Sequence, residues 1–97
     1  MNAPKLLSKE EIQKRAKKEV NWKVMEGHHL KGIFRFPDFA SSMNFAVKVG
    51  KIAEEMDHHP EIDIGSGLVK LTIYTHDRDG LTTWDFEFAE KVNNLMD

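Results

Sequence analysis

The chain has 97 residues, of which 40% are hydrophobic and 31% charged, a composition typical of one small globular domain and not of a disordered or fibrous protein. The formal net charge is −2, which argues against a general nucleic-acid or membrane binder because such proteins usually carry a basic excess. The absence of cysteine excludes disulfides, thiolate metal sites and cysteine nucleophiles.

The sequence also gives no indication of a targeting signal. Residues 1–7 contain neither the apolar segment of a signal peptide nor a small-residue cleavage site. No apolar run approaches the roughly 18 residues needed to span a bilayer. We therefore expect a cytoplasmic protein without a membrane partner, made of a single domain over residues 1–97.

The first third of the chain predicts a surface helix followed by a hairpin. Ser8 and Glu11 have the spacing of a capping box, which predicts a polar, lysine-rich helix over residues 9–19. Residues typical of β-structure then predict strands over 21–26 and 30–36, and the glycine and two histidines between them indicate the turn.

Residues 38–56 give the longest helical pattern. At about 100° per residue their apolar side chains cover an arc of roughly 220°, whereas a helix that packs on one sheet needs only about 100°. The excess predicts that something besides its own sheet covers this helix. A second subunit is our first interpretation, and coverage by the helix at residues 9–19 is the alternative.

The remaining residues predict a second hairpin and a last helix. Strands are expected over 61–64 and 68–75, around a glycine-rich turn, and Thr82 or Thr83 is expected to cap a helix that runs to about residue 96. The order α-β-β-α-β-β-α predicts an α+β fold in which helices pack on one face of a four-stranded antiparallel sheet.

Three histidines are predicted to meet at one edge of this fold. His58 and His59 follow the long helix, and Pro60 stops that helix and favours an extended conformation at His59. His76 follows the strand that pairs with residues 61–64, so the hairpin returns it toward Pro60. Imidazole is the side chain best placed to exchange protons near neutral pH, and the cluster therefore points to general acid–base chemistry.

Other interpretations of the histidines are open on sequence alone. A three-histidine zinc site is a weaker alternative, since structural zinc sites usually add a fourth ligand and nothing in the sequence fixes the metal geometry, and we expect no metal. Adjacent surface histidines usually have no function, and His28-His29 is assigned none. Nearby carboxylates could orient the rings or raise their affinity for protons. These carboxylates belong to Glu54, Asp57, Asp77 and Asp85.

Three separated motifs carry a resemblance to a known family. They are Ala53-Glu54-Glu55-Met56-Asp57-His58-His59-Pro60-Glu61, Leu71-Thr72-Ile73-Tyr74-Thr75-His76-Asp77 and Gly80-Leu81-Thr82-Thr83-Trp84-Asp85. With Trp22 and the Phe36-Pro37-Asp38-Phe39-Ala40 entry to the long helix, they resemble the pterin-4a-carbinolamine dehydratase family, also called dimerization cofactor of hepatocyte nuclear factor. The resemblance covers nearly the whole chain, and the combination is more specific than any one motif.

The resemblance implies dehydration of 4a-hydroxytetrahydrobiopterin to quinonoid dihydropterin, a step of tetrahydrobiopterin recycling that needs neither metal nor organic cofactor. It implies that His58 and His76 exchange protons while His59 mainly holds and polarises the pterin. It also implies a wider set of substrate-binding residues: Glu54, Asp57, His59, Pro60, Thr75 and Asp85. Members of this family form homodimers or homotetramers through sheet edges and long helices, in agreement with the wide apolar arc.

Three positions depart from the pattern of the familiar mammalian members. Ile62 and Ser66 stand in place of aromatic residues and Trp84 in place of an arginine, all expected beside the pterin pocket or close to it. The departures leave the natural pterin open. They also keep two alternatives: a non-catalytic oligomeric adaptor or transcriptional coactivator-like module, and a pterin-binding role in molybdopterin metabolism. The protein partners to consider are an aromatic amino-acid hydroxylase and a transcription factor.

Overall fold

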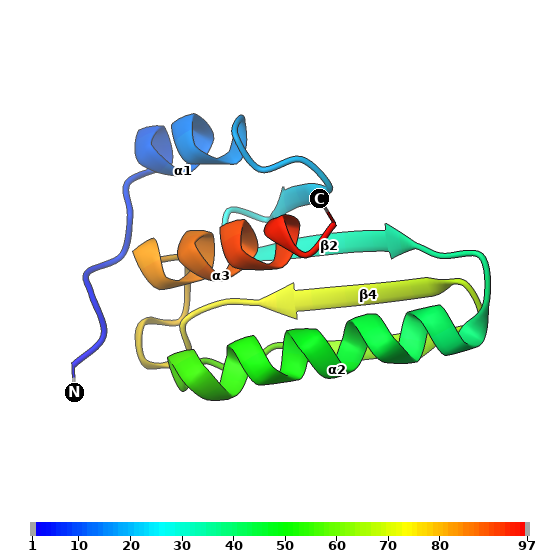
Figure 1. Cartoon of the computed structure of the whole chain (residues 1–97). Coiled ribbons are helices and arrows are strands. Elements are labelled where there is room, and N and C mark those ends of the chain that lie inside the picture. Colours follow the sequence, from blue (N-terminus) through cyan, green and yellow to red (C-terminus); the bar gives the residue numbers. More distant parts are fainter. Residues whose placement is uncertain (1, 97) are drawn as a thin grey trace.

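The computed structural model describes residues 2–96, which fold into three α-helices, one short 3₁₀ helix and four strands (Figure 1). In chain order the elements are α1 (Lys9–Ala16), β1 (Trp22–Met25), β2 (His29–Arg35), α2 (Phe39–Met56), β3 (Glu61–Gly65), β4 (Leu68–Ile73), η1 (His76–Arg78) and α3 (Thr83–Asn94). The predicted order α-β-β-α-β-β-α is confirmed, with η1 as an addition.

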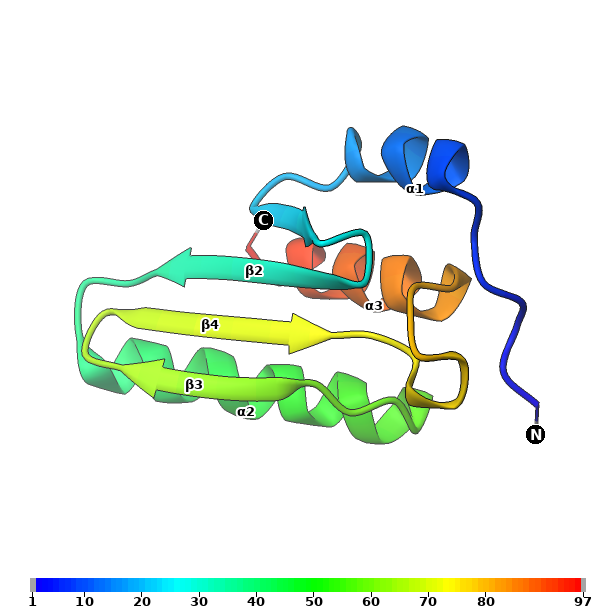
Figure 2. The same cartoon turned by 180° about the vertical axis from the view of Figure 1, so that it is seen from behind.

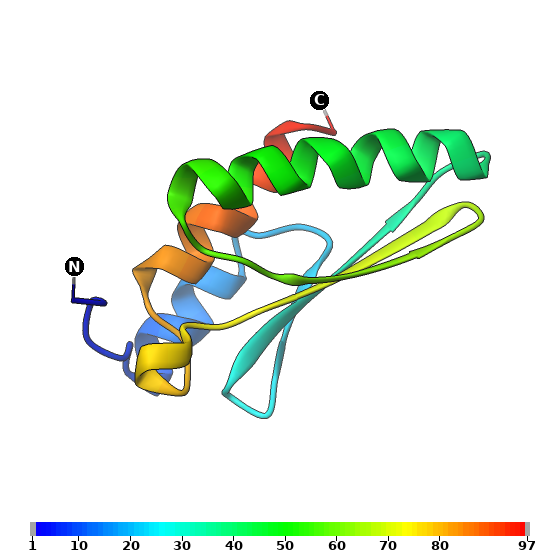
Figure 3. The same ribbon diagram turned by 90° about the horizontal axis from the view of Figure 1, so that it is seen from below.

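The four strands form one antiparallel sheet in the order β1-β2-β4-β3 (Figure 2). Each hairpin contributes one inner strand, so β2 and β4 pair in the middle of the sheet. Seen from below, the α-helices lie on one side of the twisted sheet, with α2 against β3 and β4 and α1 against β1 (Figure 3). The predicted α+β architecture with helices on one face is therefore confirmed.

α1 is capped as predicted but is shorter. The Ser8 hydroxyl accepts a hydrogen bond from the Glu11 N–H at 3.1 Å, and Ile12 is the buried residue of the helix. The helix ends at Ala16 instead of residue 19. Short helices in proteins depend on packing of an apolar face, and this one has little apolar surface to extend it.

The first hairpin turn lies one residue earlier than predicted. Glu26 and Gly27 both have positive φ angles, 56° and 63°, which suit the right-handed twist of the flanking strands. His29 therefore belongs to β2 and not to the turn, opposite Met25 of β1. A non-glycine residue with positive φ is uncommon, so the position of this turn was not evident from Glu26.

β4 ends at Ile73 instead of Thr75, because the chain leaves the sheet there and folds into η1. Thr75 returns to the ladder only as a single bridge to Gly80, which closes the turn that contains η1. The predicted alternation along this strand is nevertheless present. Val69, Leu71, Ile73 and Thr75 are all buried on the helix-facing side of the sheet.

The core lies between the sheet and the two longer helices. Trp22 of the edge strand β1 is buried at the β1 side of this core, with edge-on ring contacts to Phe34 at 5.7 Å and to Phe88 of α3 at 6.4 Å. Its indole N–H donates to the Asn93 side chain at 3.0 Å, so the ring buries no unpaired donor. The Trp22 ring has room there because Gly32, the residue opposite it on β2, has no side chain.

α2 buries one face and leaves another apolar face uncovered. Phe45, Val49 and Ala53 pack into the core, whereas Phe39, Met43 and Val47 are 52%, 38% and 56% exposed. We call these last three residues the α2 stripe. The interpretation that α1 covers this face is wrong, since α1 lies beside β1 at the other edge of the sheet. None of the helices in residues 2–96 combines the length and apolar character required to span a bilayer.

Gly32→Ala is expected to destabilise the fold. A Cβ atom at this position would lie 2.9 Å from ring atoms of Trp22 and of Phe34, both packed in the core. Overpacking of this kind costs about 1–3 kcal/mol of unfolding free energy, to be measured by urea denaturation. Gly50→Ala in α2 is the control, because nothing lies within 4 Å of its added Cβ. Helix propensity should make that variant equally or more stable than wild type, and equal destabilisation of both variants would contradict the prediction.

Candidate functional site

The end of α2 sets the positions of the first two histidines. Asp57 adopts the left-handed conformation, with φ 51°, and its N–H closes the helix onto the Ala53 and Glu54 carbonyls. The His58 N–H donates to the Ala53 carbonyl at 3.0 Å. The chain then continues through His59 and Pro60 into β3. The two histidine side chains consequently leave the helix end in different directions, one buried and one exposed.

His58 is held by a buried carboxylate. Its Nε2 lies 2.6 Å from Oδ1 of Asp85, a residue of the first turn of α3 that has no solvent exposure. The second oxygen of Asp85 accepts from the Thr82 N–H at 2.9 Å and from the Thr75 hydroxyl at 2.8 Å. Asp85 therefore closes the capping box of α3 and at the same time binds the histidine that follows α2.

The directions of these hydrogen bonds form one consistent chain. The Trp84 N–H donates to the Thr82 hydroxyl oxygen, the Thr82 hydroxyl donates to Thr75, and the Thr75 hydroxyl donates to Asp85. An ionised carboxylate only accepts, so Nε2 of His58 carries the hydrogen in their contact. Nδ1 of His58 is then the nitrogen that remains free to take a proton.

His59 has a looser version of the same arrangement. Its Nε2 is hydrogen-bonded to Oε2 of Glu54, but both side chains are more than half exposed. Surface pairs of this kind contribute little to stability because water competes for both partners. Glu54 can therefore favour one orientation of the His59 ring without fixing it as firmly as Asp85 fixes His58.

His76 reaches the same place from the other hairpin. It is the first residue of η1, and it borders the same cavity as the residues that follow α2. A cavity of about 220 Å³ opens between these segments. It is lined by Asp57, His58, His59, Thr75, His76, Asp77 and Trp84. We call it the histidine cavity.

The predicted site residues divide between the cavity wall and its support. Besides the three histidines, the cavity wall includes Asp57 and Thr75, whereas Glu54, Pro60 and the buried Asp85 are not part of it. Glu54 and Asp85 instead act on the cavity through His59 and His58. An effect of Asp85 on a substrate would thus pass through the His58 ring.

The three departing positions lie in three different environments. Trp84 lines the cavity, with its ring centroid 5.9 Å from that of His58. Ile62 lies on β3 and packs against the core. Ser66 belongs to the turn after β3, where the adjacent Gly67 N–H donates to the Ser42 hydroxyl near the start of α2. The expectation that Ser66 lies near the cavity is wrong within one chain, since the 18 residues of α2 separate the two ends.

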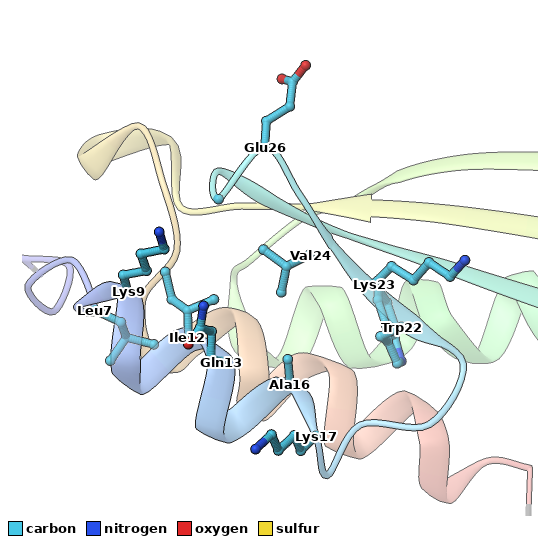
Figure 4. Close-up of a pocket in the computed structure, with 11 residues that line it drawn as sticks. Leu7, Lys9, Ile12, Gln13, Ala16, Lys17, Trp22, Lys23, Val24 and Glu26 are labelled. Atoms are coloured by element: carbon cyan, nitrogen blue, oxygen red, sulfur yellow. The ribbon is translucent and has the colours of Figure 1, made fainter.

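Two further observations bear on ligands. Within residues 2–96 no group of three or more His, Asp or Glu side chains is arranged to hold a metal ion. A larger hollow, of about 1070 Å³, lies between α1 and β1 and contains no histidine (Figure 4). Apolar side chains of α1 and β1 face this groove, with lysines around it, and none of its lining residues also lines the histidine cavity.

The sequence interpretation missed two contributors to the site. The turn that carries His76 is bonded to the first hairpin, because His28 Nε2 lies 2.8 Å from Oδ1 of Asp79. Tyr74 packs its ring against His76 with centroids 4.2 Å apart. The bias of Asp79-Gly80 toward a turn was visible in the sequence, but nothing in it indicated that the turn reaches His28.

A family model described as pterin 4 alpha carbinolamine dehydratase matches residues 5–95, which is nearly the whole chain. The chain belongs to this family. The histidine cavity, built from the motifs that carried the resemblance, is therefore the candidate active site of a pterin-4a-carbinolamine dehydratase family member.

Relatives in the same family span bacteria and archaea. A protein of Rubrobacter xylanophilus provisionally named pterin-4-alpha-carbinolamine dehydratase is 44% identical over 89 residues, which cover 92% of this chain and 83% of the relative. A Sulfolobus acidocaldarius protein with the same provisional name is 38% identical over 90 residues, which cover 93% of this chain and 98% of the relative.

Solved structures of two related proteins agree with the fold. A Brucella melitensis protein described as a transcriptional coactivator/pterin dehydratase matches with a TM-score of 0.87 and 28% identity, over 93% of this chain and 97% of that one. A pterin dehydratase-like protein described as a RuBisCO assembly factor of the alpha-carboxysome matches with a TM-score of 0.67 and 25% identity, over 77% of this chain and 88% of that one.

Asp85→Asn is expected to lower the unfolding free energy by about 2–3 kcal/mol. The amide nitrogen would face buried groups that now donate to a carboxylate oxygen, which leaves at least one donor unpaired. Urea denaturation followed by circular dichroism measures the change. Glu54→Gln is the matched control, because that carboxylate also bonds a histidine but is exposed, and its effect should stay within about 0.5 kcal/mol. A smaller effect for Asp85→Asn than for Glu54→Gln would contradict the prediction.

Proposed function

We propose that this protein is a hydro-lyase that dehydrates 4a-hydroxytetrahydropterins to quinonoid dihydropterins at the histidine cavity. The observation that carries the proposal is the His58–Asp85 pair, whose geometry leaves one free histidine nitrogen at a cavity shared with two further histidines. An imidazole oriented by a buried carboxylate is the arrangement that enzymes use to accept a proton and to stabilise the resulting cation. Membership of the family supplies the substrate class.

The reaction requires one proton to be given and one to be taken. The C4a–oxygen bond breaks and the hydroxyl leaves as water after it receives a proton, while N5 loses its proton and forms a double bond to C4a. Hydroxide is a poor leaving group, so an acid must act at the oxygen and a base at the nitrogen. Two imidazoles perform both tasks and exchange their protonation states in each turnover.

We assign the base to His58 and the acid to His76. Asp85 stabilises the imidazolium that His58 becomes when its Nδ1 takes the N5 proton. His76 faces the same cavity from an exposed position. After each turnover His76 regains a proton from water and His58 releases the N5 proton from Nδ1 to water in the cavity, so both return to their starting states. His59 then holds and polarises the pterin from the third side, supported by Glu54.

Trp84 is the aromatic wall of this cavity. Its ring lies next to His58, and no other tryptophan, tyrosine or phenylalanine is part of the lining. A pterin is flat and conjugated, so an aromatic side chain beside the bases gives it a surface to pack on. Neither Ile62 nor Ser66 is part of this lining, so the indole is the aromatic surface that the cavity offers to a pterin.

His58→Ala and His76→Ala should each lower kcat for 4a-hydroxytetrahydropterin dehydration by about 10²–10⁴-fold, the usual range for loss of a general acid or base. The measurement is a coupled assay in which a phenylalanine hydroxylase generates the 4a-hydroxy intermediate and its decay is followed by ultraviolet absorbance. His59→Ala should affect KM more than kcat, because its proposed role is to hold the substrate.

The spontaneous decay of the intermediate is the baseline of this assay. Asp63→Asn, an exposed change on β3 outside the lining of the histidine cavity, serves as the control for protein handling and should leave the rate unchanged. The proposal fails if wild type and both alanine variants all run at the spontaneous rate, provided that circular dichroism shows them folded.

We also propose that the protein is a homo-oligomer that associates through the α2 stripe. Phe39, Met43 and Val47 recur every four residues and so form one apolar row on the helix, which water covers in a single chain. A twofold axis would place this row against the same row of a second copy and bury both. Within residues 2–96, no other helix or strand covers the α2 stripe.

Val47→Glu should convert the oligomer to a monomer. A carboxylate in the middle of the buried row would have to lose its hydration without a partner, which disfavours association strongly. Sedimentation velocity measures the change, with Lys48→Glu as the control, since it adds the same side chain one residue away on an exposed polar position. A wild-type protein that sediments as a monomer at micromolar concentration would refute the proposed assembly.

A protein-binding role is the second candidate function, favoured by the same exposed row. The related structures described as a coactivator and as an assembly factor make it worth a direct test. The two candidates separate by variants: loss of activity in His58→Ala with intact assembly supports the enzyme, whereas a wild-type protein that assembles without any dehydratase rate supports the binding module.

A further inference from the structure

A second group of rings lies beside the histidine cavity, and two of its members, His28 and Tyr74, have no part in the chemistry assigned above. The Tyr74 ring lies between two imidazoles, with its centroid 4.5 Å from that of His28 and 4.2 Å from that of His76. The planes are tilted by 46° and 33°, within the range of offset aromatic contacts. We call His28, Tyr74 and His76 the ring stack.

The ring stack is closed into a circuit by the turn that carries His76. His28 Nε2 donates to Oδ1 of Asp79 at 2.8 Å, and the Asp79 N–H donates to the carbonyl of His76 at 3.1 Å. Nδ1 of His28 lies 3.1 Å from Nδ1 of His29, within hydrogen-bond distance. Contacts therefore run from His76 through Tyr74, His28 and Asp79 back to the backbone of His76.

The His76 ring is less restrained than the rings of His58 and His59, so its orientation depends more on the contacts of the ring stack. It is exposed, and it borders two hollows: the histidine cavity and a second one of about 320 Å³ that is also lined by His59, His28 and Tyr74. Space on both sides permits more than one rotamer of its ring. Whereas His58 and His59 are oriented by hydrogen bonds to carboxylates, the His76 ring is in contact with the face of Tyr74.

We propose that Tyr74 is a positioning residue for the acid His76, and that His28 and Asp79 hold Tyr74 in place for this purpose. The inference rests on the proposed function, because it concerns the geometry of the proton donor. The tyrosine ring limits the imidazole to one side of the cavity, and its electron-rich face attracts the imidazolium form that an acid requires. Misplacement of a reacting group by about 1 Å can reduce a rate considerably, so one ring contact is enough to matter.

Three variants test the role of the ring. Tyr74→Phe keeps the ring and removes the hydroxyl, whereas Tyr74→Leu keeps an apolar side chain and removes the ring. Tyr74→Phe should leave kcat within about twofold of wild type. Tyr74→Leu should lower kcat by about three- to tenfold with KM unchanged within twofold, as expected when a single aromatic contact is lost in the transition state only. His28→Leu, which removes the outer ring, should change kcat in the same direction by a smaller factor.

Proton NMR of the full-length protein gives a readout independent of activity. The face of Tyr74 should shift the His76 ring protons upfield in wild type and in Tyr74→Phe, and the shift should disappear in Tyr74→Leu while the His58 ring protons stay in place. His76→Gln identifies the His76 resonances. Thermal denaturation of each variant shows that the samples compared are folded, and should Tyr74→Leu fail to fold, His28→Leu is judged by the same two readouts.

Several results would overturn the inference. Unchanged kcat in Tyr74→Leu removes the positioning role, and an equal loss in Tyr74→Phe assigns the effect to the hydroxyl. A raised KM with unchanged kcat makes Tyr74 a substrate contact. A wild-type protein without dehydratase activity overturns the proposed function, and with it the role of Tyr74 in catalysis. If the His76 signal is nevertheless shifted upfield, the contact between Tyr74 and His76 is present and only the function has failed.

Discussion

The carboxylate of Asp85 connects three parts of the fold that are distant in sequence. A buried charge is costly unless hydrogen bonds replace its lost hydration, and here they come from His58 after the C-cap of α2, from Thr75 beyond β4 and from Thr82 at the N-cap of α3. The Thr75 hydroxyl and the Thr82 N–H occupy one oxygen, so the other is available to His58. Among the described residues no buried side-chain polar atom lacks a partner, which is the condition for such a network to favour one arrangement.

The histidines differ in how firmly they are held, and this difference suits the two halves of an acid–base reaction. His58 is buried, with its tautomer set by a partner that is itself immobile. His76 is exposed on a short turn and depends on ring contacts and on Asp79, whose side chain is largely in water. A base that takes a proton from a bound substrate benefits from fixed geometry, whereas a group that must be recharged from solvent has to remain accessible.

Much of the fold and part of the site could be predicted from sequence because both depend on local signals. Hydrophobic alternation located β4, Pro60 located the end of α2, and the His58-His59-Pro60 motif with His76 located the cavity. The spacing of Thr82 and Asp85 was available as a capping box, but not the second bond from Asp85 to His58, which depends on how α3 packs.

Features that depend on turn geometry could not be predicted in this way. Ser66 was expected near the cavity, yet β3 carries the chain away from it. The residue after Ser66, Gly67, is bonded to Ser42 near the start of α2. The ring stack depends on two turns that meet in the His28–Asp79 contact. One contains Glu26 and Gly27, both with positive φ, and the other contains Asp79 with φ 52°. A glutamate at positive φ is uncommon, so nothing in the residue type indicates the conformation of Glu26, whereas the Asp79-Gly80 pair indicates a turn but not its contact with His28.

The layout of α2 bears on whether catalysis and association could coexist. The α2 stripe ends at Val47, and the histidines begin 11 residues later, a separation of about 16 Å along a helix that rises 1.5 Å per residue. A partner seated on the stripe, whether a second copy or another protein, would therefore cover the first half of α2 and leave the histidine cavity open. Val49 and Ala53 on the opposite face of the same helix are buried in the core, and His58 follows the end of the helix. The proposed association and the proposed proton transfer therefore involve different faces and different ends of α2. Retention of the histidines is thus no argument against a binding role, and an exposed apolar row is no argument against an enzyme.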